Sequence, residues 1–129
     1  MFTMPITHTI DYEKRRICST CSDVMTRKDF SLHMESVWNN VQHYGFDELV
    51  DTTQADWSEF KFSDVFEIVK KEFELIGLSS NSGLAWVVEK GMQEDIARFY
   101  LTSLGFTTKK PRRIDLFYSH ENATEWLES

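Results

Sequence analysis

The chain has 129 residues, of which 41% are hydrophobic and 14% aromatic, and its formal net charge is −7. This length and content predict one globular domain over residues 1–129 and exclude a disordered chain. The acidic balance argues against nucleic-acid binding, because an acidic chain repels a polyanion. With no apolar run of about 18 residues and no recognisable secretion signal, we expect a cytoplasmic protein without a transmembrane segment.

The first predicted elements form a β-hairpin. Ile6 to Ile10 and Arg16 to Ser22 are β-prone, and the polar stretch 11–15 between them is typical of a hairpin loop. The two strands are therefore expected to run antiparallel. Thr26 then predicts the N-cap of a helix, whose apolar residues fall at helical spacing up to a stop at Gly45.

A third strand and a second helix are predicted next. The stretch 46–53 is β-prone, and Gln54 to Phe62 is predicted to be a loop, although it is unusually rich in aromatic side chains. Ser63 predicts the cap of a helix that ends at Gly77. The stretch 79–83, rich in Ser and Gly, is predicted to be a flexible connector.

The rest of the chain is organised around Leu84 to Val88. Five apolar residues in a row predict a strand covered on both faces, best placed in the middle of a sheet. Gln93 to Leu104 predicts an amphipathic helix, Ile114 to Tyr118 a last strand, and Ser119 or Asn122 the cap of a short final helix. This order predicts an α/β fold with a mostly parallel five-stranded sheet, an N-terminal β-hairpin and four helices.

Four stretches of the chain carry a resemblance to a known family. They are Tyr12-Glu13-Lys14-Arg15-Arg16-Ile17, Phe46-Asp47-Glu48-Leu49-Val50-Asp51, Leu84-Ala85-Trp86-Val87-Val88 and Ala123-Thr124-Glu125-Trp126-Leu127. With the order and lengths of the elements, they resemble the STAS domain, and more closely the small stand-alone bacterial proteins called SpoIIAA-like or STAS/SEC14-like. The resemblance covers nearly the whole chain. It implies the SpoIIAA-like fold, while these stand-alone relatives have no settled activity.

The resemblance also implies a possible phosphorylation site. Anti-sigma-factor antagonists of this family carry a phosphorylatable hydroxyl at the start of the helix after the third strand. The matching residue here is Ser63, with Ser58 earlier in the same loop. This chain has Asp64 after Ser63, where the antagonists tend to have paired hydroxyl residues and a glycine, and its charge would repel a phosphate. A plain helix cap is therefore the favoured role for Ser63.

Residues of the kind that carry catalysis or bind metals are present but form no strong motif. Cys18 and Cys21 form a C-x-x-C in a predicted strand, where residues three apart point to opposite faces, so we expect two reduced thiols with one in the core. The four histidines are scattered, and Ser119 to Glu121 are neighbours in sequence that do not face one another. We therefore predict no catalytic residue, no metal and no cofactor.

The strand ends are the predicted place for a binding site, because ligands of parallel α/β sheets bind beyond the carboxyl ends of the strands. The residues expected there are Thr52, Thr53, Glu89, Lys90, Ser119 and His120. The aromatic loop with Asp56, Trp57, Phe60 and Phe62 leaves the same edge. Its rings suit a small apolar ligand or a partner surface; alternatively they pack as a lid over the core or form a dimer contact.

A basic run lies before the last predicted strand. Lys109, Lys110, Arg112 and Arg113 place four positive charges in five residues, broken by Pro111. They are a candidate docking patch for an anionic partner or a lipid headgroup. The alternative is a solvated loop.

Taken together, these features favour a non-enzymatic STAS-like binding module. Its partner would be another protein, a second copy in a homodimer, or a small apolar ligand, bound through the aromatic loop and the strand ends. One alternative is a small enzyme that uses Asp56, Glu89 or His120 as acid or base. Another is a regulator switched by phosphorylation of Ser63.

Overall fold

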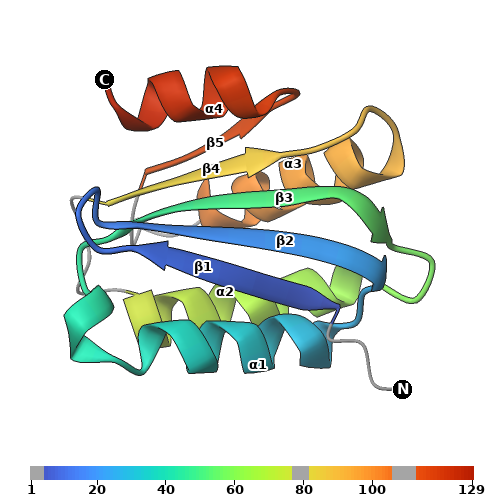
Figure 1. Ribbon diagram of the computed structural model, residues 1–129. Coiled ribbons are helices and arrows are strands. Elements are labelled where there is room, and N and C mark those ends of the chain that lie inside the picture. The colour runs from blue at the N-terminus through green and yellow to red at the C-terminus, as the bar shows by residue number, and fades with distance from the viewer. Residues whose placement is uncertain (1–4, 77–81, 106–112) are drawn as a thin grey trace.

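The computed structural model describes residues 5–76, 82–105 and 113–129 (Figure 1). The elements follow one another as β1 (Ile6–Asp11), β2 (Arg16–Val24), α1 (Arg27–Trp38), the 3-10 helix η1 (Val41–His43), β3 (Asp47–Asp56), α2 (Phe62–Ile76), β4 (Gly83–Val87), α3 (Met92–Gly105), β5 (Arg113–Phe117) and α4 (His120–Leu127). One sheet contains the five strands in chain order, with β1 antiparallel to β2 and the other neighbours parallel. The predicted α/β fold with its N-terminal hairpin is therefore confirmed. The described helices are too short or too polar to cross a bilayer.

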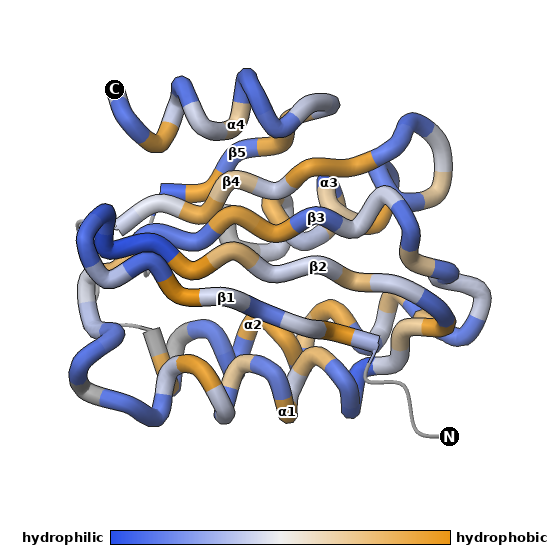
Figure 2. Tube along the Cα trace, viewed as in Figure 1, coloured by the Kyte–Doolittle hydropathy of each residue, from blue (hydrophilic) through white to orange (hydrophobic). Residues whose placement is uncertain are grey.

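Helices cover the sheet on both faces. The larger core lies between the sheet and α1, α2 and α3, on what we call the inner face, and the smaller core lies under α4 on the outer face. Figure 1 shows α4 separated from the other helices by the sheet, and Figure 2 shows hydrophobic stretches of β3 and β4 running side by side. The main contacts of α4 with the sheet are made with β3, β4 and β5.

Strand β4 has the burial that its sequence predicts, since all five of its residues are buried. Leu84 and Trp86 belong to the inner core, whereas Ala85 and Val87 belong to the outer core. Its predicted central position is wrong, because β3 is the middle strand and β4 is the next one. An uninterrupted apolar run indicates that a strand is covered on both faces, but it does not show that the strand is the middle one. Here two neighbouring strands, β3 and β4, are covered on both faces.

The first helix starts as predicted but is shorter. Thr26 and Asp29 form a capping box, in which the Thr26 side chain accepts a hydrogen bond from the Asp29 backbone amide at 3.2 Å. The helix ends at Trp38, so the predicted continuation to Gly45 is wrong. Two asparagines follow Trp38, and the Asn40 side chain accepts from the Gln42 amide at 3.0 Å, which favours the separate turn of η1.

The third strand is longer than predicted, and the second helix starts earlier. Strand β2 extends to Val24, which lies opposite Asp56, so β3 continues through the first three residues of the stretch predicted to be the aromatic loop. Helix α2 begins at Phe62, and the Asp64 carboxylate accepts from the Lys61 amide at 3.0 Å. Ser63 is therefore the second residue of the helix, and the prediction that it is the cap is wrong. Of the predicted connector 79–83, residues 79–81 lie outside the described residues.

Candidate functional site

The aromatic residues of the predicted loop are divided between the core and the surface. Trp57 and Phe60 are only 3% and 7% exposed. The Trp57 ring stacks on Phe30 with ring centroids 5.4 Å apart, and Phe60 packs edge-on against Trp57 at 5.0 Å. These two rings therefore cover the inner core. Of the roles predicted for the aromatic loop, a lid over the core is the one that the burial of Trp57 and Phe60 favours.

Phe62, in contrast, is 49% exposed and belongs to a cluster on the surface. Its ring lies edge-on to Phe99 of α3, 5.1 Å between centroids, and Phe66 of α2, which is 57% exposed, lies 5.6 Å from the same ring. We call Phe62, Phe66 and Phe99 the aromatic surface. The sequence prediction missed Phe66 and Phe99. Phe66 could have been found, because it lies outside the buried helical stripe of Val65, Ile68 and Val69.

Charged residues of both signs surround the aromatic surface. Exposed side chains on α2 and α3 and just before α2 include Lys61, Glu67, Lys70, Asp95 and Arg98. Lys70 follows Phe66 by one helical turn, and Asp95 precedes Phe99 by one turn, so each lies on the same helix face as its aromatic neighbour. An apolar centre with a polar rim is the composition of a protein interface.

The predicted strand-end residues do not form one open pocket. Thr52 is completely buried, accepts a hydrogen bond from Trp86 Nε1 at 3.0 Å and donates to the Val87 carbonyl at 3.2 Å. Gln93 of α3 donates to the Thr53 carbonyl at 3.3 Å and accepts from the Glu89 amide at 3.1 Å. These bonds tie the ends of β3 and β4 to α3, so this part of the edge is closed.

Three other residues predicted at this edge, Asp56, Glu89 and Lys90, are exposed. Asp56 accepts from the Ser58 amide at 2.8 Å, and this bond, with the Ser58 side chain, lowers the pKa of the Asp56 carboxyl. Lys90 lies over the Tyr118 ring, 5.7 Å from its centroid, and Glu89 is exposed. Asp56, Glu89 and Lys90 do not line the two cavities found on the inner face of the sheet.

His120 has a partner that the sequence prediction missed. Its Nε2 atom lies 2.6 Å from Asp51 Oδ2, and the other carboxylate oxygen accepts from the Thr53 amide at 2.8 Å and the Thr53 hydroxyl at 2.7 Å. Burial raises the pKa of Asp51, but the hydrogen bonds from Thr53 and His120 outweigh burial, so the pKa lies below its ordinary value. Asp51 and His120 are distant in sequence and meet only because α4 starts beside β3.

The lowered pKa of Asp51 predicts how stability depends on pH. A carboxyl group with a depressed pKa in the folded state stabilises the protein above its ordinary pKa, and this contribution is lost as pH falls through the folded value. We expect the stability advantage of the wild type over Asp51→Asn to shrink as the pH falls below roughly pH 5. Urea unfolding at a series of pH values measures this difference.

The exposed Asp23 of β2 offers a matched control. Asp23 has a φ of 60°, which asparagine also tolerates, so Asp23→Asn should leave the backbone undisturbed. An Asp51→Asn difference that does not change with pH, or that only equals the Asp23→Asn difference, would contradict the assignment.

The two serines of the possible phosphorylation site are both exposed. Ser58 lies in the turn after β3, and Ser63 lies in the first turn of α2 beside Asp64. Asp64 is also 3.8 Å from the Arg27 guanidinium. Phosphorylation at either serine stays a prediction.

The two cysteines lie as predicted. Cys21 belongs to the inner core and Cys18 packs against the outer core, and both are free thiols. Burial raises the pKa of both thiols, so the reactive thiolate is disfavoured. Within the described ranges, no group of three or more His, Cys, Asp or Glu residues is placed to hold a metal ion.

The basic run falls mostly outside the described residues. Lys109, Lys110 and Arg112 lie in the range 106–112, whereas Arg113 begins β5. The Arg113 guanidinium lies 4.8 Å from the centroid of the Trp126 ring, a cation–π contact that joins β5 to α4. Binding of an anion by the basic run stays a prediction.

A polar cluster that the sequence prediction missed lies in the inner core. The Ser19 hydroxyl donates to Glu48 Oε2 at 3.3 Å, and His33 Nε2 lies 3.2 Å from both the Ser19 oxygen and the same Glu48 oxygen. Glu48 is 3% exposed. The alternation of side chains along β3 could have revealed the position of Glu48, because Glu48 and Val50 are two residues apart and therefore lie on the same, inner face of the sheet.

This Ser19–His33–Glu48 cluster has the residue types of a catalytic triad but a different geometry. In a triad, the serine and the acid contact different nitrogens of the imidazole ring. One nitrogen takes the proton of the serine hydroxyl, and the other donates to the acid, which orients the ring. Here both the hydroxyl and the carboxylate contact Nε2 of His33. The cluster therefore does not have the arrangement that activates a serine nucleophile.

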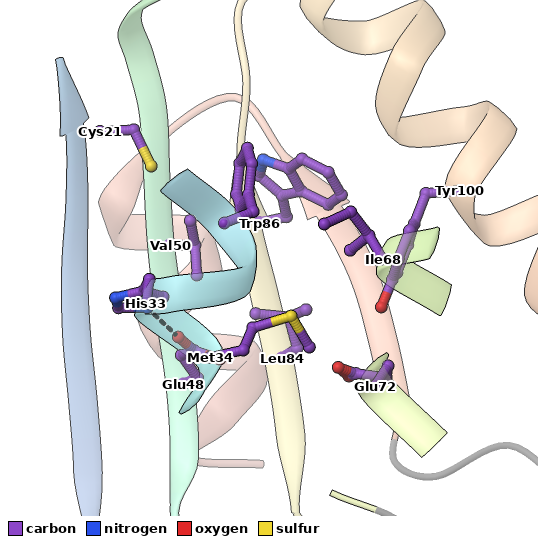
Figure 3. Close-up of a pocket in the computed structure, with 11 residues that line it drawn as sticks. Cys21, His33, Met34, Glu48, Val50, Ile68, Glu72, Leu84, Trp86 and Tyr100 are labelled. Carbon is purple, nitrogen blue, oxygen red and sulfur yellow. Dashed lines mark hydrogen bonds and ion pairs between the residues drawn. The ribbon is translucent and has the colours of Figure 1, made fainter. Parts of the chain in front are cut away.

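The polar cluster borders a cavity of about 50 Å³ between the inner face of the sheet and helices α1, α2 and α3. The residues lining this cavity are Cys21, Phe30, His33, Met34, Glu48, Val50, Ile68, Glu72, Leu84, Trp86 and Tyr100 (Figure 3). A second cavity of about 20 Å³ is apolar and is bordered by Trp57 and Phe60. Both are much smaller than the several hundred Å³ of a typical pocket for a drug-sized ligand.

The sequence matches no protein-family model and no curated protein. Among solved structures, the fold is similar to that of an uncharacterised protein of the DUF3478 family from Shewanella loihica PV-4, described as having a SpoIIAA-like fold. The match has a TM-score of 0.63 and 17% sequence identity, and it covers 98% of this chain and 97% of that chain. At this identity the likeness shows the fold, and the predicted SpoIIAA-like fold is confirmed.

Proposed function

We propose that this protein is a non-enzymatic binding module with the SpoIIAA-like fold and that it associates with a second copy of itself through the aromatic surface. The observation that carries the proposal is the exposure of Phe62 and Phe66 beside Phe99. The fold buries the other aromatic residues of the predicted loop, Trp57 and Phe60, whereas Phe62 and Phe66 stay exposed. Clustered exposed aromatic side chains mark interaction sites.

The charges around the aromatic surface favour a second copy as the partner. Lys70 and Asp95 lie one turn from the aromatic rings, and both signs occur in the rim. A rim with both signs can pair with itself across a two-fold axis, and it gives no preference for a strongly acidic or strongly basic partner. A two-fold contact also doubles the number of aromatic rings that leave water, because each copy contributes the same three.

The test is the oligomeric state of Phe66→Ser. We expect the wild type to pass from monomer to dimer as its concentration rises in sedimentation equilibrium. A central aromatic residue of an interface contributes about 2 kcal/mol or more, so Phe66→Ser should weaken the dimer by about 30-fold. Helical circular dichroism should stay unchanged, because the Phe66 side chain is exposed.

Leu32→Ser is the matched control, because Leu32 is an exposed apolar residue on α1, away from the aromatic surface. It should leave the dimer unchanged. A wild type that stays monomeric at every concentration would contradict self-association and leave a different protein as the partner to seek. Equal weakening by Leu32→Ser would show that the dimer does not form through the aromatic surface.

Acid–base catalysis at the strand ends has less support. The contact between His120 and Asp51 is suited to a general base. However, the His120 side chain is largely exposed, and His120 lines neither of the two cavities described above. A phosphorylation switch at Ser63 has exposure in its favour and the neighbouring Asp64 against it.

A further inference from the structure

Strand β1 forms one border of the sheet. In the described part of the chain it pairs with β2 alone (Figure 1). The Ser22 amide donates to the Pro5 carbonyl at 2.7 Å, and in an antiparallel ladder residues that bond to the neighbouring strand alternate with residues that do not. Every second residue after Pro5 therefore bonds to β2. The residues between them, whose N–H and C=O groups point away from β2, are Ile6, His8 and Ile10. We call these outward backbone groups the β1 edge.

The β1 edge lacks the features that usually keep a strand edge from pairing with another chain. Such features are charged side chains, proline, bulges and very short strands. Strand β1 has no acid, lysine or arginine before its last residue, Asp11, contains no proline, and pairs with β2 without a shift of register. Strand β5, at the other border of the sheet, carries the charged residues Arg113 and Asp115. Of the two borders, β1 is therefore the one suited to accept a further strand.

The sequence of β1 makes its edge complementary to a second copy of itself. When two β1 strands run antiparallel with His8 at the centre, Ile6 of one copy lies opposite Ile10 of the other, and Thr7 lies opposite Thr9. Both isoleucines belong to the inner face, so the two threonines belong to the outer face, and like side chains meet on each face. The outward N–H and C=O groups of the two copies bond to each other in this register.

His8 lies opposite its own counterpart in this pairing, so its charge matters. The His8 ring packs edge-on against His33 with ring centroids 5.7 Å apart. Burial, and after it the neighbouring His33, lowers the pKa of His8 below its ordinary value, although Glu48 acts in the opposite direction. At neutral pH the two rings are therefore uncharged. Two uncharged rings can lie opposite each other, whereas like charges directly opposite would repel.

We propose that two copies of the chain pair through the β1 edge about a two-fold axis at His8, so that the sheet of one copy continues into the sheet of the other. A stable interface usually buries about 800 Å² on each partner. One short strand offers less, so this contact forms at higher protein concentration than the proposed dimer of the aromatic surface. The two contacts use different elements, because Phe62 and Phe66 lie on α2 and Phe99 lies on α3.

Cysteine cross-linking tests both the contact and its register. In the proposed pairing, Thr7 of one copy and Thr9 of the other have Cα atoms about 4.5 Å apart, within the roughly 4.4–6.8 Å that a disulfide spans. Each threonine lies about 7–8 Å from its own counterpart, beyond that range. Both side chains are exposed, so Thr7→Cys and Thr9→Cys should fold like the wild type.

Each variant is treated with oxidised glutathione at high protein concentration, alone and mixed with the other. We expect a several-fold higher yield of covalent dimer from the mixture of Thr7→Cys and Thr9→Cys than from either variant alone, measured as intact mass without reductant. The wild type, which keeps Cys18 and Cys21, gives the background. Equal yields from the mixture and the single variants, or no covalent dimer above the background, would overturn the proposal.

His8→Lys tests the same contact without a cross-link, and Thr20→Lys, at an exposed position of β2, is its control. Both are made in Phe66→Ser, in which the contact through the aromatic surface is weakened, so the two proposals can fail independently. Two lysines opposite each other repel, so His8→Lys should weaken association in sedimentation equilibrium by about fivefold and Thr20→Lys should leave it unchanged. Equal association of the two variants would overturn pairing through the β1 edge.

Discussion

Replacing Trp86 with alanine is expected to cost about 3–5 kcal/mol of the free energy of unfolding. Trp86 is buried in the inner core, where its ring lies 5.7 Å from Tyr100 and 6.4 Å from Trp57. Its indole N–H also donates to Thr52 at 3.0 Å. The substitution removes a large apolar area, leaves a cavity and breaks a buried hydrogen bond. Urea unfolding followed by circular dichroism measures the loss.

Trp126→Ala makes the same chemical change at a half-buried position. Trp126 of α4 packs against Phe117 at 5.5 Å between centroids and lies under the Arg113 guanidinium, partly open to water. Its loss should cost clearly less than the loss of Trp86, because less apolar area is buried. Equal losses in the two variants would mean that Trp86 does not hold the core together.

Replacing His33 with leucine is expected to cost about 3 kcal/mol, because it removes the imidazole from a buried carboxylate. His33 Nε2 lies 3.2 Å from Glu48 Oε2, and the two side chains are 7% and 4% exposed. His33→Leu leaves Glu48 in the core with the Ser19 hydroxyl as a donor. The free energy of unfolding in urea at neutral pH measures the effect.

The double variant with leucine at both positions separates the pair from its parts. Without the carboxylate there is no charge to compensate, so His33→Leu with Glu48→Leu should be more stable than His33→Leu alone. His8→Leu is the control, because the exposed His8 ring packs edge-on against His33 at 5.7 Å without being part of the cluster. A His33→Leu loss no larger than that of His8→Leu would refute a buried pair that depends on His33.

Much of the fold could be predicted from local patterns. The apolar run at Leu84 to Val88 predicted a covered strand, and Thr26 with Asp29 predicted the start of α1. The ends of the elements were harder. Strand β3 reaches Asp56 because β2 extends beside it, and this pairing between distant segments leaves no mark in the local sequence of β3.

The candidate sites were less predictable than the fold, because they are made by residues far apart in the sequence. The aromatic surface joins Phe62 to Phe99, and the polar cluster joins Ser19 to Glu48 through His33. Aromatic content alone did not show that Trp57 is buried and Phe62 is exposed. Trp57 is buried because its ring stacks on Phe30 of α1, and this contact joins segments that are distant in the sequence.

The strand order of the sheet bears on how the protein folds during synthesis. Because β1 to β5 pair in the order in which they occur in the chain, each new strand can dock onto one already formed as the chain leaves the ribosome. Such neighbour-by-neighbour pairing keeps loop-closure costs low and favours rapid folding. The ion pair of Arg16 with Glu128, at 3.3 Å, is an exception: it links the first parallel strand to the segment after α4 and can form only when that helix has been made.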